Sequence, residues 1–503
     1  MSPVAKLFGA CLASHLIPYI SAAAIGSGQS LPIAIPNGKS PGPPGSSGSV
    51  YGSPSLVGPD GNPVDTADSA TVPNYDLVPG QQKDADLGLY LDLSEAQSPQ
   101  PIRGTGGGTD PGPRNMIYEK LNPDLYAPPG TDAGDVDNLK WPMGLSFNRP
   151  GIKHAGFARQ QNVNELTAAT EMAGVDMHLE PNAYRELHWH QANEWSYIFN
   201  GSVRVGAVDE AGQTTYDDLN AGDVWFFPAG KPHTIQALEK GAEFLLVFDS
   251  GSFSEENTFL ASELFLRTPK SVLAKNLKTD VSSFDNIPQD QLYIFPGTPP
   301  PAKLSAQNIT GPAGSISTNP YTYHFSQQEP YVVDGGSVKI LDPTTFPIAA
   351  NFSVAYVTIQ PGAMREIHWH TDSDEWNFFI SGNARMSVFS APTASRTFDF
   401  AEGDVGYIPF PDSHYIENTG DIDVVYLEVL QAPKFTDISV AQWLGLTPPR
   451  VVKDTLSLPD EVIVNLPKYK NYIVPGNTNL TTTNFTGEGP IGTNYTGNGP
   501  TTI

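Results

Sequence analysis

One short phrase occurs twice in this chain, and the repeat limits what the chain can fold into. Arg185-Glu-Leu-His-Trp-His190 returns as Arg365-Glu-Ile-His-Trp-His370, and each copy is followed by a glutamate, Glu194 or Glu375. Histidine is scarce, with 10 in the whole chain, so two matching HisXHis pairs are unexpected by chance. The repeat therefore indicates a duplicated unit that uses its histidines for chemistry.

A third histidine follows each pair at nearly the same distance, so both halves offer the same four polar groups. Residues two apart on a β-strand project from one face, which lets both histidines of a pair point at one atom. Three neutral imidazoles and a carboxylate without a thiolate suit a divalent first-row metal such as manganese or iron, rather than structural zinc. A lone histidine is more often a core or surface residue, and it is the two complete copies that favour metal binding. The predicted ligands are His188, His190, Glu194 and His233 in the first half, and His368, His370, Glu375 and His414 in the second.

The segments around these motifs are typical of antiparallel β structure. Runs rich in Val, Tyr, Phe and Thr, such as 195–201 and 424–429, alternate with Gly, Pro and Asn turns. Two short helical segments, 262–267 and 440–445, each precede Thr-Pro at corresponding places in the halves. The chain is therefore predicted to be all-β, with a few short helices. Its domains are expected at 113–290 and 331–470, joined by a Pro-rich linker at 291–330.

The two ends of the chain have a different composition. Residues 1–24 carry one lysine, an apolar stretch and Ser-Ala-Ala-Ala, which predicts a secretory signal peptide. The single cysteine, Cys11, lies within it, so no disulfide or thiol chemistry is expected in the mature protein. Residues 25–112 are rich in Pro, Gly and Ser and are predicted to be disordered or wrapped over the core. No later stretch is apolar enough to predict a membrane span.

The tail at 471–503 is rich in Asn, Thr and Gly and contains several N-glycosylation sequons. Asn200 also forms a sequon, but it lies inside the first repeated motif, where a glycan is expected to fit poorly. The candidate glycosylation sites are Asn308, Asn351, Asn479, Asn484 and Asn494. These sites agree with the signal peptide in predicting a secreted protein.

The chain is strongly acidic, with 54 acidic and 28 basic residues and a formal net charge of −26. Nucleic acids and anionic membranes attract the opposite sign, so neither is expected as a partner. The charge fits a secreted protein in an acidic medium, and it equally fits a soluble, glycosylated surface.

An arginine precedes each HisXHis pair, and in so acidic a chain it stands out. Arg185 or Arg365 beside a metal indicates a small anionic ligand such as a carboxylate. Strict strand alternation would place Arg185 on the face opposite His188, so this interpretation requires a bulge or a turn before the histidine. The alternative is a surface ion pair.

The halves differ in the loop that follows the third histidine's strand. In the first half this loop, which we call the lid, reads Ser254, Glu255, Glu256, Asn257 and Thr258. Small polar residues suit a mobile lid, and a glutamate on it could serve a closed site as proton donor or acceptor. The second half has a shorter loop without the glutamate pair. It carries Glu428 on the preceding strand, where the first half is aligned with Val247.

The third histidines lie in segments that resemble a known family. Gly222–His233 and Gly403–His414 share Gly-Asp-Val, a proline and the final histidine, and together with the HisXHis phrases they resemble the two motifs of the cupin superfamily. Cupins are small barrels of the double-stranded β-helix or jelly-roll type, and a chain with two is a bicupin. The resemblance spans about 113–470. It departs from the pattern only at turn positions, Asn182, Pro411 and Ala237.

Within that superfamily the chain closely resembles the bicupin oxalate decarboxylases, particularly secreted fungal ones. The resemblance implies two Mn²⁺ ions per chain and conversion of oxalate to formate and carbon dioxide, with dioxygen needed for turnover. It implies that Glu255 is the acid–base residue of the lid and that Arg185 binds oxalate beside the first metal. Arg365 and Glu428 would flank the second. Homo-oligomers, as trimers or hexamers, are also implied.

Two other functions stay open on the sequence. A related oxalate oxidase would keep the metal and make hydrogen peroxide, although the Ser-Glu of the lid argues against it. A storage-type bicupin would be no enzyme, although both complete ligand sets argue against that. Since the lid glutamate occurs only in the first half, we expect the first site to be the main catalytic one and the second chiefly structural.

Overall fold

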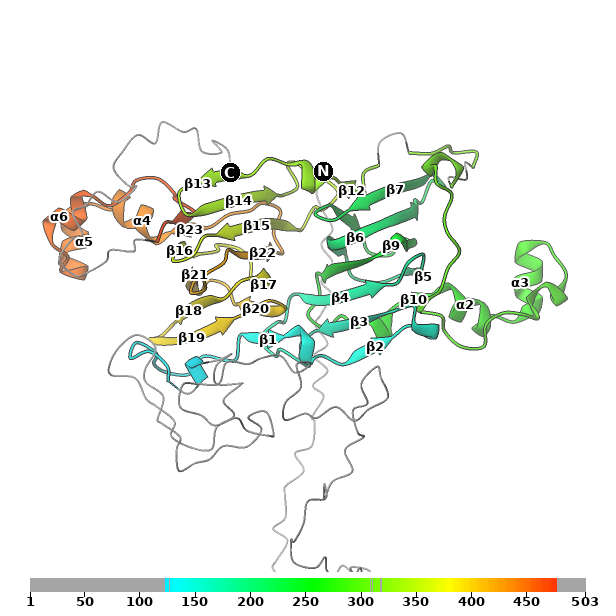
Figure 1. Cartoon of the computed structure of the whole chain (residues 1–503), viewed down its shortest axis with the longest axis horizontal. Helices are drawn as coiled ribbons and strands as arrows, with labels where there is room; N and C mark the ends of the chain where they lie inside the picture. The colour runs from blue at the N-terminus through cyan, green and yellow to red at the C-terminus, as the bar shows by residue number, and fades with distance from the viewer. Residues whose placement is uncertain (1–122, 126, 308, 310, 317–318, 477–503) are drawn as a thin grey trace, which may run out of the picture. The chain divides into compact units, whose positions relative to one another are not determined.

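The computed structural model describes residues 123–476, except 126, 308, 310, 317 and 318 (Figure 1). The predicted signal peptide, the segment 25–112 and nearly all of the tail lie outside the described residues. So do four of the sequons, Asn308, Asn479, Asn484 and Asn494. Among the helices that the model describes, none has the length and apolarity needed to cross a membrane.

The first barrel is an antiparallel sheet in which the main path runs β12-β8-β6-β9-β4-β3-β2, with β5, β7, β10 and β11 attached beside it. Its strands are β2 (Asn148–Pro150), β3 (Gly156–Gln161), β4 (Ala173–Leu179), β5 (Tyr184–Trp189), β6 (Glu194–Val208), β7 (Thr214–Asn220), β8 (Val224–Phe227), β9 (His233–Phe248), β10 (Phe259–Leu260), β11 (Ile294–Phe295) and β12 (Thr322–Tyr323).

The second barrel consists of two sheets, ordered β1-β20-β17-β22-β15-β14-β13 and β19-β18-β21-β16-β23, with β24 paired to β16. Its strands are β1 (Lys140–Pro142), β13 (Tyr331–Val333), β14 (Gly336–Leu341), β15 (Ser353–Ile359), β16 (Met364–Trp369), β17 (Glu375–Ser381), β18 (Ala384–Ser390), β19 (Ala394–Phe400), β20 (Asp404–Ile408), β21 (Ser413–Asn418), β22 (Val424–Leu430), β23 (Ile438–Ser439) and β24 (Ile473–Val474). The prediction of an all-β chain with a few short helices is confirmed.

Helices are short and follow the barrels at corresponding places. The α-helices are α2 (Ala261–Arg267), α3 (Lys270–Leu277), α4 (Val440–Leu446), α5 (Pro449–Leu456) and α6 (Asp460–Val464). Single 3-10 turns are η1 (Pro123–Leu125), η2 (Met143–Leu145), η3 (Ile152–His154), η4 (Glu255–Asn257), η5 (Val281–Phe284), η6 (Leu304–Ala306) and η7 (Phe325–Gln327). The α2 and α4 helices lie where the sequence predicts the two Thr-Pro-terminated segments.

A glycine marks the same bend in both barrels. Gly201 has φ +75° and Gly382 has φ +82°, a left-handed conformation that side chains rarely adopt. A Cβ at Gly201 would also lie 2.0 Å from the Gly241 carbonyl oxygen. The first barrel carries β6 through this bend as one strand, whereas the second barrel breaks into β17 and β18. β9 likewise runs on where the second barrel breaks into β21 and β22, and these two long strands hold the first barrel in one connected sheet, whereas the second forms two.

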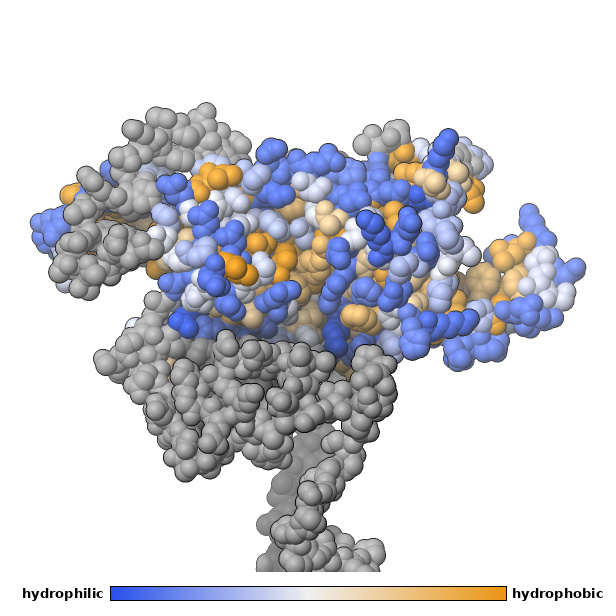
Figure 2. Space-filling model, viewed as in Figure 1, coloured by the Kyte–Doolittle hydropathy of each residue, from blue (hydrophilic) through white to orange (hydrophobic). Residues whose placement is uncertain are grey.

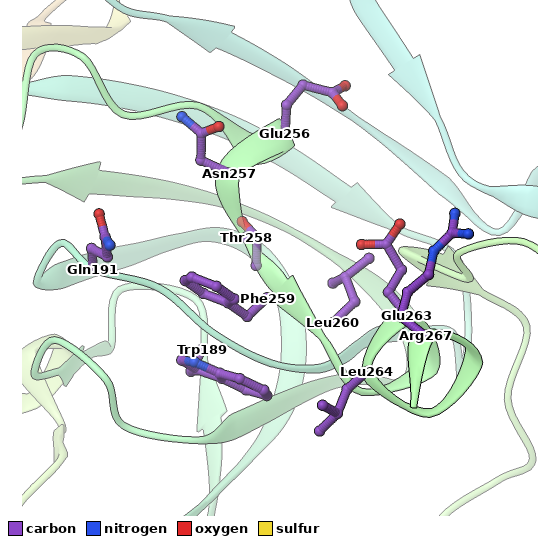
Figure 3. A pocket seen from close by; sticks show the side chains of 10 residues that line it. All are labelled: Trp189, Gln191, Glu256, Asn257, Thr258, Phe259, Leu260, Glu263, Leu264 and Arg267. Atoms are coloured by element: carbon purple, nitrogen blue, oxygen red, sulfur yellow. The ribbon is translucent and has the colours of Figure 1, made fainter. Parts of the chain in front are cut away.

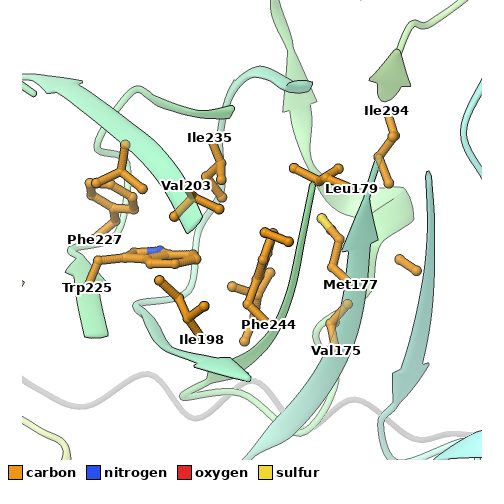
Figure 4. Packing of buried hydrophobic residues seen from close by; sticks show 14 of the residues in the cluster. Val175, Met177, Leu179, Ile198, Val203, Trp225, Phe227, Ile235, Phe244 and Ile294 are labelled. Atoms are coloured by element: carbon orange, nitrogen blue, oxygen red, sulfur yellow. The ribbon is translucent and has the colours of Figure 1, made fainter. Parts of the chain in front are cut away.

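Alternating apolar side chains fill each barrel. Val175, Met177 and Leu179 of β4 point inward with Phe244 and other residues of the first cluster (Figure 4). A second cluster fills the other barrel, and a third contains residues of both barrels, such as Trp195 and Trp376. Their burial removes apolar surface from water, which is the main stabilising contribution in a chain without disulfides.

The domain boundaries differ from those expected, because short strands cross them. β1 comes from the expected first domain, but it pairs with β20 of the second barrel. β11 and β12 come from the expected linker, but they pair with β5 and β8 of the first barrel. β24 comes from the expected tail and pairs with β16. Two or three residues suffice for each pairing, which is too few to leave a periodic pattern in the sequence.

Two buried carboxyl groups should stabilise the folded state more at acid pH than at neutral pH. Burial and the Asp399 charge raise the pKa of Asp124 to about 7, and burial and Glu243 do the same for Asp176. The folded state binds these protons more tightly than the unfolded chain does. The resulting contribution to the free energy of unfolding is fully present below about pH 3.8 and is lost as pH rises towards 7. Each carboxyl contributes up to about 4 kcal/mol.

We therefore expect urea unfolding of the wild type to show this contribution falling between pH 4.5 and 7. Replacing both aspartates by asparagine removes the two titrations, so the unfolding free energy of wild type should fall relative to that of the variant as pH rises. A difference independent of pH would contradict the assignment.

Candidate metal centres and active site

Each barrel holds one group of four buried side chains that converge on a point. In both groups the ligand atoms lie within 4.8 Å of one another. The first group joins His188, His190, Glu194 and His233, and the second joins His368, His370, Glu375 and His414. The structure thus brings together all eight residues that the duplicated motifs single out.

Hydrogen bonds fix all six histidines in one tautomer. Each Nδ1 lies against a main-chain carbonyl oxygen, which can only accept, so Nδ1 carries the proton and Nε2 faces the cluster with its lone pair. The acceptors are Glu186, Ala192 and Lys231 in the first barrel, and Glu366, Thr436 and Asp412 in the second, at 2.5–3.2 Å. Among the described residues, buried His233 Nε2 and His368 Nε2 have no hydrogen-bond partner. These lone pairs fit a divalent metal ion at the centre of each group.

The surroundings of the first group favour the protonation states that a metal needs. Burial and the charge of Arg185 hold the pKa of His188 well below its usual value. Burial alone would raise the pKa of Glu194, but the adjacent His190 and His233 bring it well below the ordinary range. Neutral imidazoles and an ionised carboxylate are what a metal ion binds.

Trp225 distinguishes the first centre from the second. Its indole Nε1 donates to Glu194 Oε1 at 2.7 Å, while Glu194 Oε2 lies 3.0 Å from His190 Nε2. Strand register places Gly406 at the equivalent position, and Glu375 Oε1 has no hydrogen-bond partner among the described residues. The repeated motifs did not single out this tryptophan, although the first copy reads Gly-Asp-Val-Trp where the second reads Gly-Asp-Val-Gly.

Trp225→Phe should loosen the first metal selectively, because it removes the one donor that orients the outer oxygen of Glu194. Loss of such a partner typically weakens metal affinity by about 10–100-fold. We expect competition with a chelator to release one metal per chain earlier than in wild type. The matched control is Phe400→Leu beside Gly406, which should leave that release unchanged. Equal release from both variants would contradict the role.

Arg185 lies inside the barrel, as the anion-binding interpretation requires. The pairing of β5 with β9 shifts register between Arg185 and His188, which is the bulge that turns both side chains to one side. Its side chain is 1% exposed, so the alternative of a surface ion pair is wrong. Nη2 donates to Glu255 Oε2 at 3.0 Å, and Nε and Nη1 have no partner among the described residues. These free donors suit a carboxylate.

The lid is closed over this arginine. Ser254 Oγ accepts from the backbone of Glu256 and begins η4, which turns the Glu255 side chain inward to 5% exposure. The Glu255 backbone also donates to Gln160 Oε1 at 3.1 Å. Glu256 points outward, with its side chain 70% exposed and 3.4 Å from Arg149 Nη1. The two adjacent glutamates therefore have different surroundings, and only Glu255 reaches the site.

A pocket lies on the outer side of the lid (Figure 3). Its volume is about 520 Å³, and its walls include Glu256, Asn257 and Thr258 of the lid. The rings of Trp189 and Phe259 stack at 5.4 Å across its floor.

Tyr293 is a further site residue that the sequence did not indicate. Two guanidinium groups contact its ring: the Cζ of Arg185 lies 4.5 Å from the ring centroid, and the Cζ of Arg149 lies 3.9 Å from it. The buried hydroxyl has no hydrogen-bond partner among the described residues, and burial and the Glu255 charge raise its pKa well above the usual value. Tyr293 comes from the expected linker next to β11, so no motif marks it.

The second centre is crowded by a second carboxylate. Glu428 is fully buried and accepts hydrogen bonds from Arg365 Nη2 at 3.2 Å and from Arg365 Nε at 3.4 Å. Its Oε1 also lies 3.2 Å from His370 Nε2. The alignment of Glu428 with Val247 is wrong, because Glu428 faces Asn377 as Leu246 faces Ser196. An apolar leucine thus occupies this position in the first barrel and leaves the space beside that metal group free of a competing carboxylate.

Comparison with known proteins agrees with this geometry. The model of the Cupin family matches residues 148–283 and 323–463. The chain is 44% identical over 376 residues to the oxalate decarboxylase OxdC of Bacillus subtilis, covering 75% of this chain and 97% of that protein. It is 38% identical over 404 residues to an oxalate decarboxylase of Arthroderma benhamiae, covering 75% and 93%.

Solved structures of the Bacillus subtilis enzyme superpose over the same region. The structure at pH 4.6 matches with a TM-score of 0.71 and 44% identity, and covers 75% of this chain and 98% of that one. A second structure of that enzyme, described with its Mn(II) centres, matches with a TM-score of 0.71 over 75% of this chain and 100% of that one.

Proposed function

The chain belongs to the bicupin oxalate decarboxylases of the cupin superfamily, and on that basis we propose that it converts oxalate to formate and carbon dioxide. The first centre is the main catalytic site. The observation that supports this most is the buried pair of Arg185 and Glu255 beside a complete ligand set. The second centre has no lid glutamate and is chiefly structural.

Manganese is the metal we propose for both centres. The two His₃Glu groups would hold one Mn²⁺ each, and their nitrogen and oxygen atoms suit that ion. When bound, the metal together with dioxygen supplies reversible one-electron chemistry, which makes cleavage of the carbon–carbon bond accessible.

The protein residues bind the substrate and manage its proton. The Nε and Nη1 of Arg185, which have no partner among the described residues, can each donate a hydrogen bond to oxalate. Loss of carbon dioxide breaks the carbon–carbon bond, and the remaining carbon gains one proton to become formate, so the overall reaction consumes one proton and no net electrons. The Glu255 carboxylate is placed to take up one proton and return it to that carbon, since it lies against Arg185 and is buried beneath the lid.

Closure of the lid favours decarboxylation over oxidation. A buried proton donor next to the substrate allows protonation before a second electron is lost, whereas the oxidase reaction would release hydrogen peroxide. The inward Glu255 therefore supports the decarboxylase over the oxidase, and both intact ligand groups argue against a storage protein.

The direct test combines metal analysis with an oxalate assay at mildly acid pH in air. We expect Mn-loaded protein to consume oxalate and release formate, and protein stripped with a chelator to release none. A storage protein would leave oxalate intact whether or not manganese was bound.

We propose that the protein is secreted and N-glycosylated, on the strength of its predicted signal peptide and sequons. Two described sequons differ in surroundings: Asn200 is exposed, so the expected obstacle to a glycan there is absent, whereas Asn351 Nδ2 donates to Asp249 Oδ2 at 2.7 Å. Asn351 is therefore the less accessible of the two. Glycopeptide mass spectrometry should find Asn351 unmodified, and occupancy there would contradict this.

Self-association as a trimer or hexamer is the remaining proposal. Hydrophobic side chains are exposed on the α2–α3 arm at the right of Figure 1, and orange patches mark this arm in Figure 2. Leu264 is 49% exposed, and in the second barrel Trp443 is 53% and Leu446 63% exposed on α4. Contact between copies would remove such side chains from water. Light scattering gives the mass directly.

A further inference from the structure

The arginine of the second centre has an additional carboxylate partner that the family motifs do not include. Asp437 forms an ion pair with Arg365 Nη2, and its side chain is 2% exposed. Its carboxylate also lies within 4.8 Å of the ligand atoms of His368 and Glu428. Asp437 therefore occupies the space next to the second metal group.

A lysine fixes that carboxylate in place. Lys470 Nζ pairs with the Asp437 side chain and also donates to the Asp437 backbone oxygen at 3.0 Å. Lys470 precedes β24, which pairs with the strand of Arg365 itself. The Asp437 carboxylate is thus paired with two cations from separate chain segments, Arg365 and Lys470, whereas the Glu255 carboxylate is paired with Arg185.

The first barrel has neutral residues at both equivalent positions. Phe259 pairs with Trp189 as Ile438 pairs with Trp369, so Thr258 corresponds to Asp437. Ile294 pairs with Arg185 as Ile473 pairs with Arg365, so Gln291 corresponds to Lys470. The Thr258 hydroxyl has no partner among the described residues, and Gln291 accepts from Arg149. The charged pair belongs to the second barrel alone.

The two arginines consequently differ in what they can bind. A guanidinium holds a carboxylate through two neighbouring N–H groups. Arg365 uses Nε and Nη2 for Glu428 and Asp437, which leaves only Nη1 without a partner among the described residues. Arg185 uses only Nη2, for Glu255, and its Nε and Nη1 have no partner among the described residues. Displacement of the single Glu255 carboxylate from Nη2 would therefore leave the neighbouring Nε and Nη2 for an external carboxylate.

We propose that Asp437, held by Lys470, is a built-in carboxylate ligand of Arg365 that takes the place of an external carboxylate and so confines substrate binding to the first centre. The inference deepens the proposed function, and it rests on that function for the identity of the substrate. Without Asp437, Arg365 and Lys470 would carry two positive charges against Glu428 alone, and the excess charge and the space would admit an anion.

The test uses acetate, which matches the side chain that Asp437→Ala removes and takes part in no turnover. We expect acetate, compared with equal chloride, to raise the melting temperature of Mn-loaded Asp437→Ala by clearly more than it raises that of wild type, where only the first centre can take a carboxylate. The double variant Asp437→Ala/Lys470→Met removes the positive charge together with the negative one and should lose this additional acetate effect. If acetate stabilised wild type and Asp437→Ala equally, the proposal would be overturned.

Calorimetric titration with oxalate under argon, without dioxygen for turnover, adds a count of sites. Wild type should bind one oxalate per chain, and Asp437→Ala should bind two. If Asp437→Ala does not fold, the closer isostere Asp437→Asn replaces it, and two oxalates on wild type would refute the proposal without any variant. Formate production is assayed separately, so an inactive protein that still binds one oxalate would count against the proposed function and not against the role of Asp437.

Discussion

His188→Ala lowers the manganese content from two atoms per chain to one and abolishes formate production, if the first group of ligands holds the catalytic metal. Three remaining ligands hold a divalent ion poorly, because the site loses a quarter of its donors and becomes open to water. Elemental analysis and an oxalate assay on the same preparation measure both effects.

His368→Ala is the matched control, since it removes the corresponding ligand of the second group. It should also lose one manganese but retain formate production at the first centre, corrected for any loss of folded protein. If His188→Ala kept its activity and His368→Ala lost it, the two centres would have exchanged roles.

Glu255→Gln is expected to reduce formate production by about 10²–10⁴-fold, the usual contribution of a general acid–base residue. The amide keeps the size of the side chain and can still meet Arg185, but it cannot deliver a proton. Manganese content should stay at the wild-type value, because Glu255 lies outside both ligand groups.

The adjacent Glu256→Gln provides the control for charge and loop composition. Glu256 makes an exposed ion pair with Arg149, and such pairs contribute ~1 kcal/mol or less, which corresponds to about fivefold at most. An equal loss in both variants would show that the lid needs negative charge in general and would contradict a specific proton donor.

The duplicated motifs made the ligand groups predictable, because short spacing on a strand determines direction. HisXHis needs only the two-residue alternation of a β-strand, and two copies exclude coincidence. The sequence could predict an inward Arg185 only on the condition that a bulge precedes the histidine. Strict alternation points this side chain outward, and the observed bulge turns it inward. A bulge leaves no sign in a single sequence.

The rest of the site could not be predicted, because it depends on pairing between distant segments. Tyr293 and Lys470 lie next to two-residue strands that pair with β5 and β16. Asp437 precedes a third such strand. None carries a motif, and only tertiary register shows that they meet an arginine. Glu428 was misaligned by one position for a different reason: the segment from Asn418 to Val424 has one residue more than the corresponding segment from Ala237 to Ala242.

The differences between the barrels matter more for function than their similarity. The two ligand groups are alike, but their neighbours differ: Trp225 corresponds to Gly406, Leu246 to Glu428, and Thr258 to Asp437. Each difference leaves the first centre better oriented or more open to a carboxylate. Duplication thus produced two metal groups, and the surrounding residues separate a reactive site from a closed one.

The measurement that tests this account most directly is a product balance for carbon-13 oxalate, in air at mildly acid pH. Formate is followed by NMR and hydrogen peroxide is measured in the same sample. The account predicts one formate for each oxalate consumed and only traces of peroxide. Peroxide without formate would contradict it, because it would show that Glu255 does not deliver its proton in time and that the chain is an oxidase.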